Sequence, residues 1–257
     1  MRHPAIESPR AFERACGWLA FAIPLVTTIA RAETSGDFRG DLPLVTGLGF
    51  LPLGMEGWLG IVAAQAASLI PLGGRTERVA WIGSVAAALA SRLLFELARR
   101  ALGAGERPPL ASALALAAAL TAVLSPAFQL EATSPGGAAL AATAALLAFN
   151  VADAAPARDV RASFLGGVLA SLTFAESHTA GLSLVVALAV RAALRRTLPA
   201  GRAAGAWVLG AALPEALFAL ALVVRASSPH AWLDLGLGLG QSSLAARDVS
   251  TERVTAY

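Results

Sequence analysis

A short acidic segment near the N-terminus contains the side chains best placed to do chemistry. It runs from Glu33 to Asp41 and includes Asp37 and Arg39. A carboxylate can accept the proton of a hydroxyl as that oxygen forms a new bond. The segment directly follows the first apolar run, so it suggests an enzyme whose substrates arrive along the lipid. Asp41 and Asp37 also stand beside glycines, and the alternative is that both are solvated turn residues.

Other polar candidates follow apolar runs at distant points of the chain. They are His178, Arg75, Arg78, Glu131 and Trp232. Each also has an ordinary structural explanation. The histidine can cap a helix, the arginines and the tryptophan can anchor a span among lipid headgroups, and the glutamate can be a solvated loop charge.

The composition indicates a membrane protein. The chain is 56% hydrophobic and 14% charged, with a mean hydropathy of +0.66, whereas soluble domains carry about 25% charged residues. Alanine and leucine, both strong helix formers, dominate. We therefore expect an all-α, polytopic bundle of transmembrane helices. All 20 basic residues are arginines, which reflects codon usage, so the charge predicts no nucleic-acid partner.

Seven apolar runs are candidate membrane spans. They are Cys16–Ala30, Val79–Ala98, Pro109–Leu124, Gly137–Ala152, Ala162–Ala175, Thr179–Leu194 and Ala204–Val224. Several are shorter than the roughly 20 residues of a perpendicular span. An eighth run, Trp58–Leu72, also fits a helix lying at the interface.

The distribution of arginines decides whether this eighth run crosses. If it does not, twelve arginines lie inside and seven outside, with Arg92 within a span. The inside set is Arg2, Arg10, Arg14, Arg99, Arg100, Arg107, Arg158, Arg161, Arg191, Arg195, Arg196 and Arg202. If it does cross, the arginine-rich loops after residues 98, 152 and 194 move outside, against the positive-inside rule. The chain therefore predicts seven spans with the N-terminus in the cytoplasm.

This topology divides the chain into three parts. Residues 1–14 are a cytoplasmic segment, 15–225 the transmembrane domain, and 226–257 an outer segment. Within the domain, residues 31–78 form a long outer loop with two apolar, interfacial stretches, Leu42–Met55 and Trp58–Leu72. We expect a multi-pass protein of a bacterial inner membrane. A cleaved signal peptide over the first 32 residues is the alternative to a retained first span.

Two ionisable features lie inside spans. Arg92 and Glu96 are four residues apart, which places them on one helical face where they can pair. Glu215 follows Pro214 in the last span, where an ionisable group is costly and a functional hypothesis by default. A proton or ion pathway through Glu215 would make the protein a transporter.

Five ordered motifs resemble one known family. They are Gly40-Asp41-Leu42; Ala67 to Gly73 followed by Arg78-Val79; Ser125-Pro-Ala-Phe128; Leu172 to His178; and Val224 to Trp232. In this order they are similar to the protein O-mannosyltransferase-like membrane proteins of the GT-C glycosyltransferase superfamily. The likeness covers most of residues 15–257.

The resemblance implies a function and a site. Such an enzyme transfers a sugar, mannose among the candidates, from a polyprenyl-phosphate donor to a hydroxyl on the outer face, with inversion. The acceptor would be a protein serine or threonine, or a glycan. Asp41 or Asp37 would be the base, and Arg39, Arg75 or Arg78 would hold the phosphate. His178, Glu131 and Trp232 would line the substrate site. No cofactor follows with certainty, although a divalent cation could assist.

The chain also departs from the family pattern. Leu51-Pro-Leu-Gly54 stands where the family has His-Pro-Pro-Gly, and Pro135 and Gly137 stand where Glu and Tyr are expected. Leu233, in place of glycine, follows Trp232. These changes favour the alternative that the protein is a catalytically degenerate relative with an assembly or structural role.

Overall fold

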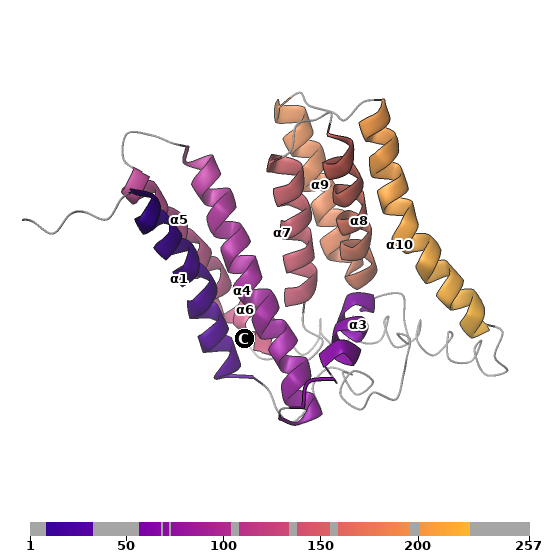
Figure 1. The fold of residues 1–257 in the computed structure, drawn as a ribbon, viewed down its shortest axis with the longest axis horizontal. Coiled ribbons are helices and arrows are strands. Elements are labelled where there is room, and N and C mark those ends of the chain that lie inside the picture. Colours follow the sequence, from indigo (N-terminus) through magenta and orange to yellow (C-terminus); the bar gives the residue numbers. More distant parts are fainter. Residues whose placement is uncertain are drawn as a thin grey trace, which may run out of the picture.

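We describe the protein from a computed structural model (Figure 1). In the described part of the chain, all the regular structure is helical. The structure describes residues 9–32, 57–67, 69–71, 73–103, 108–133, 138–154, 159–195 and 201–226. The helices are α1 (Pro9–Ile29), α3 (Trp58–Ala67), α4 (Arg75–Ala101), α5 (Pro108–Val123), α6 (Pro126–Thr133), α7 (Ala139–Ala154), α8 (Val160–Glu176), α9 (His178–Arg195) and α10 (Arg202–Ala226).

The long helices alternate in direction and give the molecule two distinct ends. α4, α7 and α9 end at the same side at which α1, α5, α8 and α10 begin (Figure 1). We call this side the arginine-rich end; its described arginines are Arg10, Arg14, Arg99, Arg100, Arg161, Arg191, Arg195 and Arg202. The short helix α3 lies at the opposite side, which we call the α3 end.

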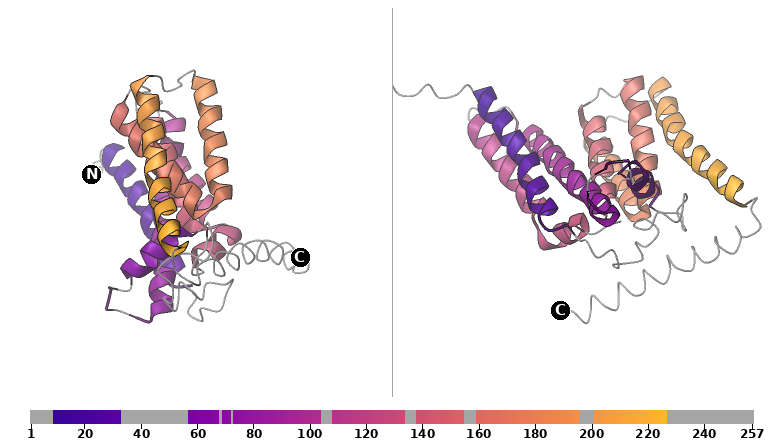
Figure 2. Two further views of the ribbon diagram at one scale, coloured as in Figure 1. Left: turned by 90° about the vertical axis from the view of Figure 1, so that its right-hand side faces the viewer. Right: turned by 60° about the horizontal axis from the view of Figure 1, so that its bottom comes forward.

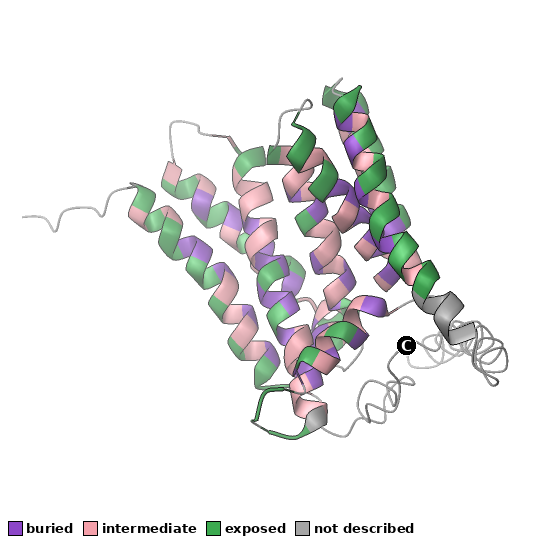
Figure 3. Ribbon diagram, turned by 45° about the vertical axis from the view of Figure 1, so that its right-hand side comes forward, coloured by how far each residue is buried: buried purple, intermediate pink, exposed green. Residues whose placement is uncertain are grey.

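Length and hydropathy identify an integral membrane protein. Four helices in the described residues are long and apolar enough to cross a bilayer: α1, α4, α9 and α10. A fifth candidate is the pair α5 and α6, which is bent by 64° at its break. α7, with 16 residues, is apolar but short. Exposed positions run along much of α10 (Figure 3), and they include Leu209, Leu213, Leu217 and Leu220, which suit contact with lipid.

Each helix except α6 overlaps an apolar run expected from the sequence, and the run at Trp58 does not pass from one end of the bundle to the other. α1 ends and α4 begins at the α3 end (Figure 1), so the connection between them returns to the side it left. The helix within it is shorter than expected and ends at Ala67. α6 was not expected. It lies in what the sequence suggested was an outer loop, because Pro126 starts a second helix after a break of only two residues.

The helices form two groups, which the turned view separates (Figure 2). α1, α4, α5 and α6 pack together, and so do α7, α8, α9 and α10. Small residues fill the core, because α4 buries Ala80, Ala87, Ala88 and Ala90 completely. Alanines and glycines at helix contacts let backbones approach closely, which increases dispersion contacts in a lipid environment.

Polar side chains of α7 join the two groups along α4. Thr143 donates from Oγ1 to the carbonyl oxygen of Ala86 at 2.7 Å. Two helical turns further along α7, Asn150 donates to the carbonyl oxygen of Leu93 at 3.4 Å and accepts from Arg100. Both residues are buried. Hydrogen bonds of this kind hold helices together where lipid offers no competing partner.

The same face of α7 ends in a buried carboxylate surrounded by three arginines. Asp153, whose side chain is 8% exposed, pairs with Arg100 of α4 at 3.2 Å. Its oxygens also lie 3.2 Å from Arg191 Nε and 2.9 Å from Arg195 Nη1 on α9. One carboxylate therefore connects three helices at the arginine-rich end.

Two glycines allow the tight crossing of α8 and α10. A Cβ atom on Gly167 would lie 2.1 Å from the carbonyl oxygen of Trp207, and one on Gly210 would lie 2.1 Å from that of Phe164. Both neighbours are backbone atoms, which cannot move aside without moving a helix. On α10, Gly205 has nothing within 4 Å of the same position.

Gly210→Ala is therefore expected to force α8 and α10 apart. The free energy of unfolding should fall by about 1–3 kcal/mol, the usual cost of overpacking. SDS titration of the protein in mixed micelles measures this change. Gly205→Ala is the matched control and should be neutral or slightly stabilising, since alanine favours a helix. Equal losses in both variants would contradict the close packing.

Asp153→Asn is expected to weaken the link between the two groups. Three guanidinium groups would remain around a neutral side chain, so the free energy of unfolding should fall by about 2–3 kcal/mol. This is less than the ~3–5 kcal/mol of a fully buried pair, because Arg195 is half exposed. Asp159→Asn is the control for the same titration. Asp159 caps α8, a role asparagine fills equally well, so an equal loss there would refute the assignment.

Candidate functional site

The α3 end carries the predicted site residues that the structure describes. α3 packs against α4 and α8, and α6 also packs against α4 at this end. Arg78 lies in the first turn of α4, Glu131 on α6, and His178 at the start of α9. Arg75 is the first residue of α4, and only its backbone is described. The fold thus brings distant parts of the sequence to one side of the molecule.

Glu176, at the end of α8, fixes the N-terminus of α3. Its backbone carbonyl accepts a hydrogen bond from the Gly57 amide at 3.1 Å. Its carboxylate accepts one from the Gly60 amide at 2.9 Å. These amides belong to the first turn of α3, where backbone N–H groups lack partners and negative charge is favoured. Gly57 has a φ of +85°, which glycine adopts without strain.

Aromatic packing fixes the other side of α3. The ring of Trp58 lies 4.6 Å, centroid to centroid, from the ring of Phe218 on α10. Trp58, Ile61, Ala64 and Ala67 form its buried face. A helix of ten residues is marginal by itself, so these contacts account for its position.

Arg78 stabilises the turn before α4. Its Nε donates to the carbonyl oxygen of Gly74 at 3.3 Å, and its Nη1 donates to that of Ile70. Glu77 accepts from the Gly74 amide at 2.9 Å and completes the start of the helix. Gly73, with a φ of +67°, makes the turn. Arg78 therefore has a structural role, in addition to any contact with a substrate.

Glu131 and His178 also make local contacts. Glu131 accepts a hydrogen bond from the Ala138 amide at 3.1 Å, which connects α6 to the start of α7. The His178 ring lies 4.7 Å from the Phe174 ring, edge to face, across the junction of α8 and α9. Gly181 lets α9 approach Phe174, because a Cβ there would lie 2.7 Å from it.

The remaining candidates, Asp37, Arg39, Asp41 and Trp232, lie outside the described residues. The described residues on either side of the stretch 33–56, which contains the acidic segment, lie at one end of the molecule. The chain leaves α1 at Ala32 and returns at Gly57, and both lie at the α3 end (Figure 1). In the described ranges, no three His, Cys, Asp or Glu side chains gather as a metal site would require.

Two residues outside the predicted site have clear roles. The sequence prediction named His178 and not Glu176. The acidic side chain two positions before the histidine could have identified Glu176 as a candidate. Asp153 lies one residue beyond the expected end of its span. An acidic residue among many arginines predicts an ion pair at Asp153. Only the packing of α4, α7 and α9 shows which arginines are its partners.

Glu215 lies on an exposed part of α10, not in the interior of the bundle. Its Oε1 accepts a hydrogen bond from Ser171 Oγ on α8 at 3.0 Å. The predicted pair of Arg92 and Glu96 is confirmed, with 3.0 Å between Arg92 Nη2 and Glu96 Oε1.

No family model, curated protein or solved structure matches this chain.

Removing the Glu176 carboxylate is expected to loosen α3. In Glu176→Ala the Gly60 amide loses its partner, and the loss of a helix cap costs about 1 kcal/mol. Hydrogen–deuterium exchange of residues 57–67 should become several-fold faster, while exchange in α4 stays unchanged. Glu131→Ala is the control, because it should affect only the start of α7. Unchanged exchange in α3 would show that aromatic packing alone holds it.

Proposed function

We propose that this chain is a membrane glycosyltransferase-like protein of the GT-C type. It transfers a sugar, with mannose as first candidate, from a polyprenyl-phosphate donor to a hydroxyl acceptor, such as a protein serine or threonine, on the outer face. The observation that supports this best is the convergence at the α3 end. Ala32 and Gly57, the described residues on either side of the stretch 33–56 that contains the acidic segment, both lie there, at the same end as the described candidates Arg78, Glu131 and His178.

The proposal includes seven spans with the arginine-rich end in the cytoplasm. α1, α4, α5, α7, α8, α9 and α10 would cross, and α3 would lie at the outer interface. Eight described arginines lie at the arginine-rich end, whereas Arg31, Arg75, Arg78 and Arg225 lie at the other. The positive-inside rule therefore favours this orientation. It places the acidic segment on the outer face, where a flipped lipid donor would meet its acceptor.

The chemistry needs one base and one cation. Asp41 would take the proton of the acceptor hydroxyl as its oxygen attacks the anomeric carbon. The bond between that carbon and the phosphate oxygen would break, and the polyprenyl phosphate would leave with the electron pair. Arg39 is the first candidate to stabilise the phosphate, because Arg78 already donates to the Ile70 and Gly74 carbonyl oxygens. Asp37 is the second candidate for the base.

A specific observation supports the non-catalytic alternative. Arg78, Glu131 and His178 all make contacts that stabilise turns or helix junctions. The same residues would be retained in an assembly protein that no longer transfers sugar.

Asp41→Asn decides between these functions. In proteoliposomes with polyprenyl-phosphate mannose and a serine- and threonine-rich peptide, transfer should fall by about 10²–10⁴-fold, the usual contribution of a general base. Glu33→Gln, in the same segment, is the matched control and should retain transfer. Full activity in Asp41→Asn would refute the assignment of the base. A wild-type protein that neither transfers sugar nor is thermally stabilised by the donor would support the assembly role.

A further inference from the structure

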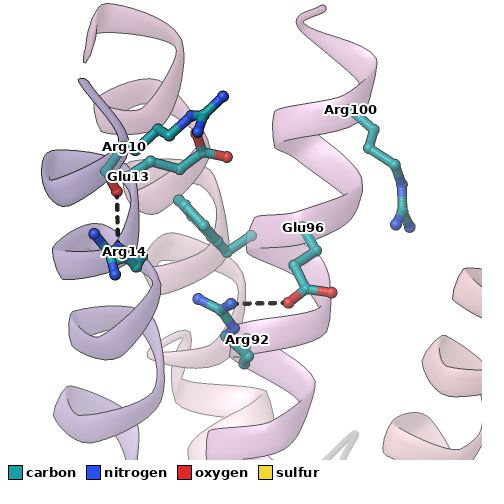
Figure 4. Close-up of a pocket in the computed structure, with 7 residues that line it drawn as sticks. Arg10, Glu13, Arg14, Arg92, Glu96 and Arg100 are labelled. Carbon is teal, nitrogen blue, oxygen red and sulfur yellow. Dashed lines mark hydrogen bonds and ion pairs between the residues drawn. The ribbon is translucent and has the colours of Figure 1, made fainter. Parts of the chain in front are cut away.

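A basic pocket lies between α1 and α4 at the arginine-rich end, far from the proposed transferase site. Its volume is about 680 Å³. The lining residues are Arg10, Glu13, Arg14, Arg92, Phe95, Glu96 and Arg100 (Figure 4). Four arginines and two glutamates therefore face one hollow.

The ion pairs around the pocket leave an excess of positive charge. Glu96 pairs with Arg92 at 3.0 Å, and Glu13 lies 3.6 Å from Arg99, which is just outside the lining. Arg100 is engaged by Asp153. Among the described residues, neither Arg10 nor Arg14 pairs with a carboxylate.

The two remaining guanidinium groups are available to an anion. Within the described ranges, the one hydrogen bond from the Arg14 side chain comes from Nε, which donates to the Arg10 carbonyl oxygen at 3.4 Å, so neither of its terminal NH₂ groups has a partner there. Two arginines with free donors match the oxygens of a phosphate, which arginine binds through paired hydrogen bonds.

In the part of the chain that the structure describes, Phe95 is the one apolar residue that lines the pocket, and an exposed aromatic side chain lies outside the lining on α1. Arg92 lies further along α4 toward the α3 end and covers Gly17, where a Cβ would come within 1.4 Å of its Nη1. Trp18 stands one turn deeper than Arg14 on the same face of α1 and is 70% exposed. A phosphate in the pocket would therefore meet cations, and the exposed ring of Trp18 further along the same face of α1 offers apolar surface to an acyl chain outside it.

We propose that this pocket binds the phosphate of an anionic phospholipid in the cytoplasmic leaflet. Under the orientation proposed above, the pocket opens at the depth of the lipid headgroups. Basic pockets between helices on the cytoplasmic side are a recognised form of anionic lipid binding. The occupied site would join α1 to α4 through the lipid, and it does not depend on sugar transfer at the other end.

Native mass spectrometry of the detergent-purified full chain tests the proposal. With equimolar phosphatidylglycerol and phosphatidylcholine, the wild type should retain phosphatidylglycerol at least about tenfold more often, consistent with two charge-assisted contacts. Arg10→Gln with Arg14→Gln should reduce this preference to near parity. Arg161→Gln with Arg202→Gln removes the same charge from exposed positions at the same end and should leave the preference intact.

Three results would overturn the proposal. The first is equal retention of both lipids by the wild type, and the second is an equal loss of preference in the control variant. The third is full displacement of phosphatidylglycerol by an equal concentration of inorganic phosphate, which would indicate a site for a soluble anion. If the double variant fails to fold, Arg14→Lys serves instead. It keeps the charge but loses the paired donors, so retention should fall by only a few-fold.

Discussion

One buried carboxylate connects the two groups of helices in this protein. Asp153 holds Arg100 of α4 and Arg191 and Arg195 of α9, while its own helix is α7. A buried charge requires partners, and arginines at this end of the helices can supply them while still reaching solvent. Thr143 and Asn150 extend the same polar face toward the α3 end. The polar face of α7 therefore contributes much of the link between the two groups, and α3, which packs against both α4 and α8, adds to it.

The two ends of the bundle carry different kinds of side chains. At the arginine-rich end, positive charge exceeds negative charge, and the surplus at Arg10 and Arg14 is suited to lipid phosphate. At the α3 end, Glu176 and the Trp58–Phe218 contact hold a short helix against α8 and α10. That helix begins where the described chain resumes after residues 33–56, the stretch that includes the proposed catalytic carboxylates.

Much of the fold could be predicted from residue patterns. The apolar runs located every described helix except α6, and the arginine-rich loops predicted that the connection through Trp58 returns to the end it left, as it does. The i, i+4 spacing of Arg92 and Glu96 predicted their ion pair correctly. The resemblance to GT-C enzymes remains a hypothesis, because its central residues, Asp37 and Asp41, lie outside the described residues. Helix α6 was not predicted. Only two residues separate it from α5, and in a sequence so rich in alanine the stretch after the break is easily taken for a loop.

The sequence by itself determined the class of protein, the positions of most of its helices and the gathering of arginines at one end of the bundle. These properties depend on hydropathy and charge, which are local sums over neighbouring residues. Only the tertiary structure decided that Glu176 caps α3, that Gly167 and Gly210 allow α8 and α10 to touch, and that Asp153 gathers three arginines. Each of these contacts joins residues dozens of positions apart, and apolar helices of similar composition give no local signal for which faces meet.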